Sequence, residues 1–233
     1  MHDGRQKIRD SSVGDVGRVF KETAKRLLPD QVAREVERYR AYPRNERPLY
    51  LRVRISSSVG LAKPKLLPVS PAQLFVFVCF GNIMRSPMCE ALMSRECSDY
   101  SLAPEVASAG LNAIQGRLVH PWAITAASEF GIALGAHRAR VLTPALVEQA
   151  TVIFTMDFQN QVQLLFRYPQ AKNKAFLLSA YAGEGYGSAE ISDPYYQDQE
   201  ATRRCYRTLA TCIRNLVRSL PMMSDSRAER LRP

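Results

Sequence analysis

The sequence lacks any long apolar run. No stretch approaches the roughly 18 consecutive apolar residues that a membrane-spanning helix needs, and the opening residues MHDGRQKIRD have no apolar segment behind their charges. We therefore expect neither a membrane span nor a secretory signal. Hydrophobic residues still make up 46% of the chain, which is enough to form the core of a soluble globular protein.

Cysteine is also scarce. The 233 residues contain five cysteines, and no two of them form a CxxC pair. A scattered, odd-numbered set argues against a disulfide framework and against a zinc site. We expect no metal, no cofactor and a reducing, cytoplasmic setting in which thiols stay free. Four of the cysteines are expected to be small core residues: Cys89, Cys97, Cys205 and Cys212.

Acidic residues are few at the N-terminal end. Residues 1–70 hold 16 of the 32 Lys and Arg residues but only 8 of the 22 Asp and Glu residues, and therefore carry +8 of the net charge of +10. The segment has no nucleic-acid-binding motif and no interleaved aromatic residues, so we expect no nucleic-acid partner. Its charge permits contact with an acidic protein partner, and self-association is an alternative.

Residues 1–70 are predicted to form a basic, mainly helical extension followed by a linker. Apolar residues recur at helical spacing in residues 13–28, and a second helix is expected over residues 31–40. Residues 49–56 alternate like a strand, with a helix as the alternative. Residues 56–71 carry Ser, Gly and three prolines and are typical of a linker.

Residues 71–220 have the alternating pattern of an α/β domain, and residues 221–233 form a polar tail. Short apolar strands are expected at residues 74–79, 105–110, 151–156 and 174–179. Helices are expected between and after them, at residues 87–97, 121–131, 157–168 and 200–220. This order predicts an open, parallel, four-stranded, flavodoxin-like sheet with helices on both faces.

The loop after the first strand carries the main functional signal. Ligands bind beyond the carboxyl ends of the strands in an open parallel sheet, and Cys79 lies at such an end. Gly81 and Asn82 tolerate positive φ angles, so that successive backbone N–H groups can face one anion at the start of the next helix. The guanidinium of Arg85 matches two oxygens of a phosphate. The predicted phosphate-binding residues are Phe80, Gly81, Asn82, Ile83, Met84, Arg85 and Ser86.

A thiol in this setting is a candidate nucleophile. A helix N-terminus and a nearby cation favour thiolate over thiol at Cys79, and Ser86 is placed to donate a hydrogen bond to the sulfur. The departing oxygen of a phosphate ester needs a proton, for which Asp193 in the sequence ISDPYYQD is the candidate. The same carboxyl group could then activate water against a phosphocysteine intermediate.

The stretch VCFGNIMRSP, together with the distant DPYY, resembles the low-molecular-weight protein tyrosine phosphatases over about residues 74–220. The resemblance extends to SAG at residues 108–110, GIALGAHRAR at 131–140 and FTMDFQNQ at 154–161. It implies that Cys79 is the nucleophile, Arg85 the phosphate clamp and Asp193 the general acid. Met84 replaces the second loop cysteine that is usual in the family.

The resemblance also bears on the substrate. A bulky aliphatic residue at Ile83 is typical of family members that act on phosphotyrosine, whereas those acting on phosphoarginine tend to have threonine there. Tyr195 and Tyr196 occupy positions where the family uses aromatic walls for a phenyl ring. The sequence SAGLNAIQGRLVHPWA is similar to bacterial members associated with exopolysaccharide tyrosine kinases, so a phosphotyrosine protein such as a bacterial tyrosine kinase is the expected partner.

Three alternative functions stay open. A phosphoarginine phosphatase and an arsenate reductase are both compatible with this fold. Arsenate reduction is disfavoured because residues 111–196 contain no cysteine. A non-catalytic phosphate-binding module is the third alternative. His137 in the HRAR stretch is expected to be a structural hydrogen-bonding residue and not a catalyst.

Overall fold

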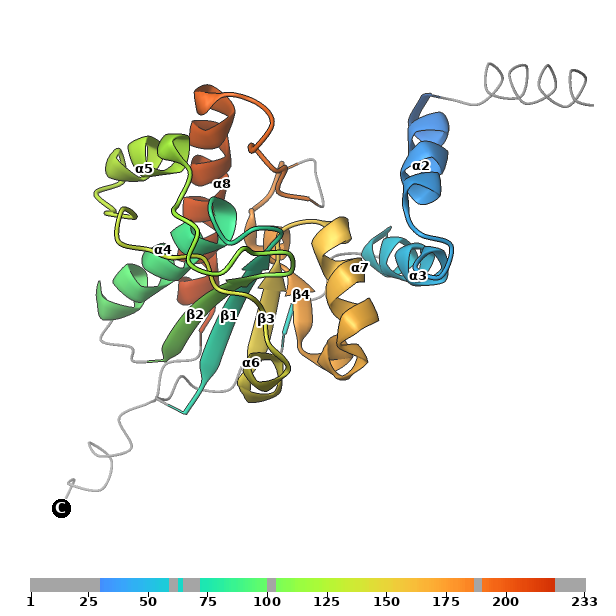
Figure 1. Cartoon of the computed structure of the whole chain (residues 1–233), viewed down its shortest axis with the longest axis horizontal. Helices are drawn as coiled ribbons and strands as arrows, with labels where there is room; N and C mark the ends of the chain where they lie inside the picture. Colours follow the sequence, from blue (N-terminus) through green and yellow to red (C-terminus); the bar gives the residue numbers. More distant parts are fainter. Residues whose placement is uncertain (1–29, 59–62, 65–71, 100–103, 187–189, 221–233) are drawn as a thin grey trace, which may run out of the picture. The chain divides into compact units, whose positions relative to one another are not determined.

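The computed structural model describes residues 30–58, 63–64, 72–99, 104–186 and 190–220. Contacts within the chain divide it into two units, Met1–Arg47 and Pro48–Pro233, and both are drawn in Figure 1. The predicted helix at residues 13–28, the tail at 221–233 and most of the predicted linker lie outside the described residues.

The described part of the first unit consists mainly of one helix, α2 (Asp30–Ala41), which matches the helix expected over residues 31–40. The turn after it is held by Arg47, whose Nε donates to the carbonyl of Tyr42 at 3.0 Å and whose Nη2 donates to the carbonyl of Arg40 at 2.9 Å. These bonds satisfy carbonyl groups at the C-terminal end of α2, which the helix itself leaves without partners.

Of the two alternatives for residues 49–56, the strand is wrong and the helix is confirmed, because this segment lies in helix α3 (Arg47–Ser58). Two members of the alternating apolar set, Leu51 and Ile55, are 45% and 65% exposed. The buried residues are Tyr50 and Val53, three positions apart on one helical face. Burial of two residues at i, i+3 spacing is the pattern of a helix, and it predicts this segment better than the alternation of four aliphatic residues does.

The sheet of the second unit has the predicted architecture. Strands β1 (Leu74–Cys79), β2 (Glu105–Gly110), β3 (Val152–Thr155) and β4 (Ala175–Leu177) are all parallel, in the order β2-β1-β3-β4. Strand β1 is central, and Cys79 at its end lies beside Gly110 at the end of β2. The carboxyl ends of the strands thus meet at one edge of the sheet, where side chains far apart in sequence converge.

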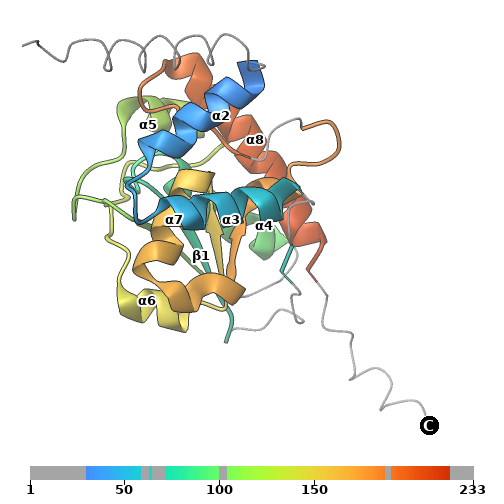
Figure 2. The same ribbon diagram turned by 90° about the vertical axis from the view of Figure 1, so that its right-hand side faces the viewer.

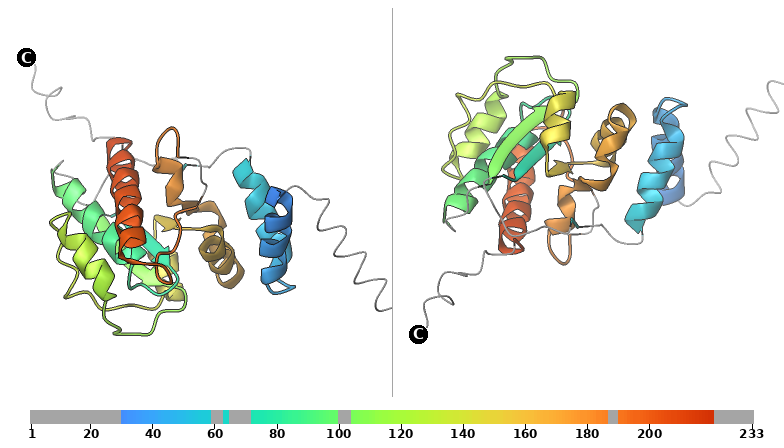
Figure 3. Two further views of the ribbon diagram at one scale, coloured as in Figure 1. Left: turned by 90° about the horizontal axis from the view of Figure 1, so that it is seen from above. Right: turned by 90° about the horizontal axis from the view of Figure 1, so that it is seen from below.

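Helices cover both faces of this sheet, as predicted. Buried side chains join α4 (Arg85–Asp99), α5 (Pro121–Ser128) and α8 (Gln199–Arg218) into a cluster on one face. A second cluster on the other face includes α6 (Pro144–Gln149) and α7 (Phe158–Arg167). Figure 2 shows α6 and α7 on the same side of the sheet, and Figure 3 shows α8 beside α4.

Some details of the elements differ from the sequence expectation. Helix α4 begins at Arg85, two residues before the expected start, so the loop that precedes it is shorter. Helix α6 was not predicted, although the Thr143 side chain caps it by accepting from the Leu146 N–H and Pro144 follows the cap. The expected fourth strand ends at Leu177, because Leu178–Tyr181 continues as a 3₁₀ helix.

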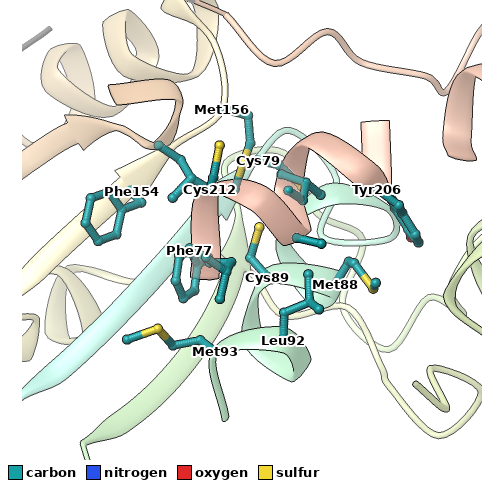
Figure 4. Close-up of a cluster of buried hydrophobic side chains, with 14 of the residues drawn as sticks. Phe77, Cys79, Met88, Cys89, Leu92, Met93, Phe154, Met156, Tyr206 and Cys212 are labelled. Carbon is teal, nitrogen blue, oxygen red and sulfur yellow. The ribbon is translucent and has the colours of Figure 1, made fainter. Parts of the chain in front are cut away.

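Alternation along β1 decides which side chains face which cluster. Phe75, Phe77 and Cys79 belong to the α4–α5–α8 side, whereas Val76 and Val78 face the α6–α7 side. Figure 4 shows Cys79 among the buried side chains of the first cluster. The other four cysteines are also buried and free, which confirms that they are core residues.

Candidate active site

The loop between β1 and α4 borders a cavity of about 450 Å³ at the carboxyl edge of the sheet. The cavity brings together the predicted nucleophile, clamp and acid, Cys79, Arg85 and Asp193, from segments more than 100 residues apart in the chain. The other residues around the cavity are Phe80, Gly81, Ile83, Met84, Asn112, Ile114, Arg117, Asp157, Gln159, Asn160, Tyr195 and Tyr196. Asn82 and Ser86 are fully buried and lie behind this wall.

The sulfur of Cys79 receives hydrogen bonds from the loop that follows it. The backbone N–H of Asn82 donates to Sγ at 3.3 Å, and the hydroxyl of Ser86 lies 3.0 Å from Sγ. Asn82 has a φ of 53°, a left-handed conformation that Asn adopts more readily than most residues. This conformation turns the loop so that its N–H faces the sulfur.

Asn82 also fixes the direction in which the Ser86 hydroxyl points. The Asn82 Oδ1 accepts from the backbone N–H of Arg140 at 2.8 Å, so its amide nitrogen faces the other way. That nitrogen donates to Ser86 Oγ at 2.9 Å and to Ser108 Oγ at 2.8 Å. Because Ser86 Oγ accepts from Asn82, its own proton is free to go to Cys79 Sγ, which is closer than the Ala109 carbonyl at 3.4 Å.

A further group of side chains holds Asn82 from outside. His137 Nε2 lies 3.2 Å from the Asn82 carbonyl and 3.1 Å from its Oδ1; both are acceptors, so this nitrogen carries the proton and donates. Burial is the largest cause of the lowered pKa of His137, and Arg140 and Arg138 add to it against the opposing charge of Glu90. The neutral ring is therefore favoured, and the expectation that His137 has a structural role is confirmed.

Arg85 is almost completely buried, with 1% of its surface exposed. Its Nη1 donates to Asp157 Oδ2 at 2.6 Å and to the Ile191 carbonyl at 2.9 Å, and its Nη2 donates to Asp193 Oδ2. Burial by itself lowers the pKa of Arg85, but Asp157, Asp193 and Cys79 together outweigh it and raise the pKa. Of the five guanidinium N–H donors, two are left without a partner in the described part of the chain.

The sequence analysis did not single out Asp157 as a site residue. It follows β3 and caps α7, where its Oδ1 accepts from the Asn160 N–H at 2.7 Å while its Oδ2 pairs with Arg85. The available signals were its position after a buried parallel strand and its place in the stretch FTMDFQNQ at 154–161. A carboxylate that binds a helix N-terminus and a buried guanidinium at once holds Arg85 in a fixed direction.

Asp193 is more accessible than Asp157, with 38% of its side chain exposed against 15%. Its Oδ2 pairs with Arg85, and its Oδ1 accepts from the backbone N–H of Tyr195 at 3.1 Å. The Gln197 side chain donates to its carbonyl at 2.8 Å. Hydrogen bonds within residues 193–197 thus hold this turn, which places the Asp193 carboxyl group at the cavity.

Tyr195 and Tyr196 both line the cavity but are held differently. The Tyr195 hydroxyl accepts from Arg117 Nη2 at 2.9 Å, and its ring lies edge-on to His120 with centroids 5.6 Å apart. Tyr196 is 93% exposed and contacts the ring of Tyr195, also edge-on. Tyr195 therefore forms a fixed wall, whereas Tyr196 projects from the rim.

The remaining loop residues are anchored from both sides. The carbonyl of Ile83 accepts from the His120 N–H at 3.1 Å, and that of Met84 accepts from the Tyr206 hydroxyl at 3.0 Å. The side chains of Ile83 and Met84 are both nearly buried, while Phe80 is 44% exposed at the mouth of the cavity.

In the described residues no group of three or more His, Cys, Asp or Glu side chains is arranged to hold a metal.

The five cysteines are expected to differ sharply in reactivity at pH 7. Burial raises the pKa of Cys97 to about 11 and those of Cys205 and Cys212 to about 12, and it also raises that of Cys89. A thiol with a pKa of 11 is about one part in 10⁴ thiolate at pH 7. Cys79, which faces the cavity and receives two hydrogen bonds, should therefore be the one thiol that iodoacetamide alkylates rapidly.

Peptide mass mapping after brief alkylation measures the relative reactivity of the five cysteines. Inorganic phosphate should slow the reaction at Cys79 by occupying the same cavity. Rapid alkylation of a second cysteine in the folded protein, at a rate unaffected by phosphate, would contradict the assignment.

Gly110 is required by the close approach of β2 to the loop. A Cβ at this position would lie 2.8 Å from the Asn82 backbone nitrogen and 2.9 Å from the Gly81 carbonyl carbon. Gly110→Ala should therefore displace the loop, with a loss of unfolding free energy of about 1–3 kcal/mol and a loss of activity of about 10²-fold. Denaturant titration and phosphatase assays measure both effects.

Gly135→Ala is the matched control, because a Cβ there meets no atom within 4 Å. It should change neither stability nor activity. Equal effects of the two substitutions would show that the Gly110 contact is unimportant.

Most of the second unit matches a known protein family. Residues 75–225 match the family model described as "Low molecular weight phosphotyrosine protein phosphatase". The chain belongs to this family. The predicted resemblance is thereby confirmed for the catalytic region, and the match leaves out the basic extension.

Relatives of this phosphatase include proteins with two named activities. The chain is 33% identical over 143 residues to the low molecular weight protein-tyrosine-phosphatase Wzb of Escherichia coli K12, and the match covers 61% of this chain and 92% of Wzb. It is 30% identical over 145 residues to the protein-arginine-phosphatase of Bacillus subtilis, and that match covers 62% of this chain and 95% of the relative. The crystal structure of Wzb from Escherichia coli K30 in complex with sulphate superposes with a TM-score of 0.58 at 29% identity, covering 64% and 99%.

The part of the phosphatase that the structure describes contains no helix long and apolar enough to span a bilayer.

Proposed function

We propose that this protein is a protein-tyrosine phosphatase that uses Cys79 as nucleophile, Arg85 as phosphate clamp and Asp193 as general acid. The observation that carries the proposal is the environment of Cys79 Sγ, which accepts from the Asn82 N–H and faces the Ser86 hydroxyl in a cavity shared with Arg85 and Asp193. Both hydrogen bonds, together with the buried guanidinium, stabilise negative charge on the sulfur.

In the first step the Cys79 thiolate attacks phosphorus, forming the S–P bond while the P–O bond to the tyrosine breaks. The loop N–H groups of residues 80–85 and the free donors of Arg85 bind the non-bridging oxygens, whose negative charge is retained through the transition state. Phosphate oxygens on Arg85 displace the carboxylate of Asp193 from the same guanidinium, and the released carboxylate takes up a proton from solvent or from the bound phosphate monoanion. The carboxyl group then delivers its proton to the departing phenolic oxygen.

In the second step water attacks the phosphocysteine. The S–P bond breaks and returns its electron pair to the sulfur, while the Asp193 carboxylate takes a proton from the water. The Ser86 hydroxyl supports this step because it stabilises the departing thiolate. Asp157 stays paired with Arg85 in both steps and keeps the guanidinium aligned.

Phosphotyrosine is the favoured substrate class because of the walls of the cavity. Tyr195 offers a fixed aromatic surface, and Ile83 contributes a nearly buried aliphatic side chain to the same cavity. Phosphoarginine is the second candidate because one relative is a protein-arginine-phosphatase. The cysteines outside the cavity are buried in α4 and α8, so no second thiol is placed for a disulfide cascade of the arsenate reductase type.

The proposal is tested by measuring kcat/KM for matched phosphotyrosine, phosphoarginine and phosphoserine peptides. The phosphotyrosine peptide should be preferred, and activity should persist in the presence of a metal chelator. Preference for phosphoarginine would replace the substrate assignment while retaining the mechanism. Phosphate binding without turnover of any peptide would support the non-catalytic alternative.

We further propose that residues 1–70 are an extension added to the phosphatase domain at 71–220, with most of helix α3 grouped by its contacts with the second unit, that residues 221–233 are a tail, and that the protein acts in the cytoplasm. The charge of +8 on the extension supports contact with an acidic partner, and self-association is the alternative. The resemblance of residues 108–123 to bacterial members associated with exopolysaccharide tyrosine kinases supports a bacterial tyrosine kinase as the phosphotyrosine substrate. Size-exclusion chromatography of the full chain and of a variant lacking residues 1–70, alone and with an acidic phosphotyrosine protein, separates these roles.

A further inference from the structure

One cation at the rim of the cavity has no neutralising partner among the described residues. Arg117 is exposed and lines the cavity beside Tyr195 and Ile114. No carboxylate pairs with it in the part of the chain that the structure describes. By contrast, Arg140 pairs with Glu90, and Arg203 pairs with Glu129. The positive charge of Arg117 is therefore available to a molecule that enters the cavity.

Arg117 is nevertheless held in place. Its Nη2 donates to the Tyr195 hydroxyl at 2.9 Å, and its guanidinium carbon lies 5.7 Å from the centroid of the Tyr195 ring. This contact uses one of the five guanidinium N–H donors. The rest of the planar fork remains open to a carboxylate or phosphate, which it can bind through two parallel hydrogen bonds.

The charge of Arg117 already acts on a neighbouring group at the rim. His120 is an edge-on neighbour of Tyr195 and caps α5 by accepting from the Trp122 N–H through Nδ1. Burial is the largest cause of the lowered pKa of His120, and the positive charge of Arg117 lowers it further. Arg117 thus adds positive charge to the rim next to Tyr195.

We infer that Arg117 makes this phosphatase selective for phosphotyrosine peptides that carry a second negative charge close to the phosphotyrosine. The inference rests on the proposed function, because it assigns a substrate class to the same site. The ring of the substrate lies against Tyr195, and the chain on either side of it crosses the rim. An acidic side chain there, or a second phosphate, comes within reach of the Arg117 fork and raises kcat/KM by favouring encounter and binding.

The test compares peptides of one length with a single phosphotyrosine flanked by either Glu or Gln, and a third peptide whose flank carries a second phosphotyrosine. We expect kcat/KM to be about three- to fivefold higher for the Glu peptide than for the Gln peptide, as for one exposed ion pair. Arg117→Gln should bring this ratio close to one, and Arg117→Glu should invert it. The doubly phosphorylated peptide shows whether phosphate serves as well as carboxylate.

Two control variants separate recognition from general effects. Arg214→Glu changes the net charge by the same amount as Arg117→Glu, at an exposed position on α8. It should keep the ratio of kcat/KM for the Glu and Gln peptides that the unmodified protein shows. Tyr195→Phe removes the hydroxyl that Arg117 contacts but keeps the cation, so it should also retain the preference. If Arg117 acted only by holding Tyr195, Tyr195→Phe would abolish the ratio as fully as Arg117→Gln.

Hydrolysis of p-nitrophenyl phosphate, which has no flanking residues, separates failure of the proposed function from failure of the inference about Arg117. If the unmodified protein fails to hydrolyse it, the proposed function fails. If it is hydrolysed but the unmodified protein shows equal kcat/KM for the Glu and Gln peptides, or if Arg117→Gln leaves the preference intact, the inference about Arg117 is overturned.

Discussion

Cys79→Ser should lower the rate of p-nitrophenyl phosphate hydrolysis by on the order of 10⁴-fold or more, as expected for loss of a nucleophile. A serine hydroxyl fits the space of the thiol and keeps contact with the Asn82 N–H and the Ser86 hydroxyl. It is not deprotonated in that setting, because its ionisation is far less favourable than that of a thiol. The binding of inorganic phosphate should therefore survive while turnover is lost, and calorimetry together with a steady-state assay separates the two.

Cys97→Ala provides the matched control for a buried thiol outside the cavity. It should cost some stability through the lost packing but leave kcat within about twofold. A Cys79→Ser protein that retained a tenth of the original activity would show that the sulfur is not the nucleophile.

Asp193→Asn should lower kcat by about 10²- to 10⁴-fold, with an effect that depends on the leaving group. The nitrophenolate of p-nitrophenyl phosphate departs without much help from an acid, whereas the phenolate of phenyl phosphate needs a proton. The substitution should therefore reduce turnover of phenyl phosphate much more than that of p-nitrophenyl phosphate. The ratio of the two rates is the measurement.

Asp157→Asn is the control that distinguishes loss of the proton donor at Asp193 from loss of an ion pair with Arg85. Both aspartates pair with Arg85, and Asn can still cap α7. Asp157→Asn should weaken phosphate binding without changing the leaving-group ratio. If both variants shifted the ratio equally, Asp193 would act through Arg85 and not as a proton donor.

The parts of the site that are contiguous in sequence could be predicted from it. Strand β1, the following loop and the start of α4 lie within residues 74–99, and their order alone suggested an anion-binding turn with a thiol at its base. Asp193 could be found because the acid lies in the loop after the last strand, beside a proline. In each case the local pattern carried both the residue type and its place at the carboxyl edge of the sheet.

The supporting contacts could not be predicted, because they join distant segments. Asp157 reaches Arg85 across 72 positions, and the Arg140 N–H that orients the Asn82 amide comes from 58 positions away. Gly110 is required only because β2 passes close to the loop. The strand alternative for residues 49–56 was wrong because Leu51 and Ile55, which suggested it, face solvent in helix α3.

The central claim is that Cys79 carries the phosphoryl group between substrate and water. It is tested most directly by quenching the enzyme in acid during turnover of p-nitrophenyl phosphate and mapping the modified peptide by mass spectrometry. The mass of one phosphoryl group on the peptide containing Cys79, formed and lost at rates compatible with kcat, is the predicted result. Turnover with no phosphorylated peptide at any quench time, or with the phosphoryl group on another residue, would contradict it.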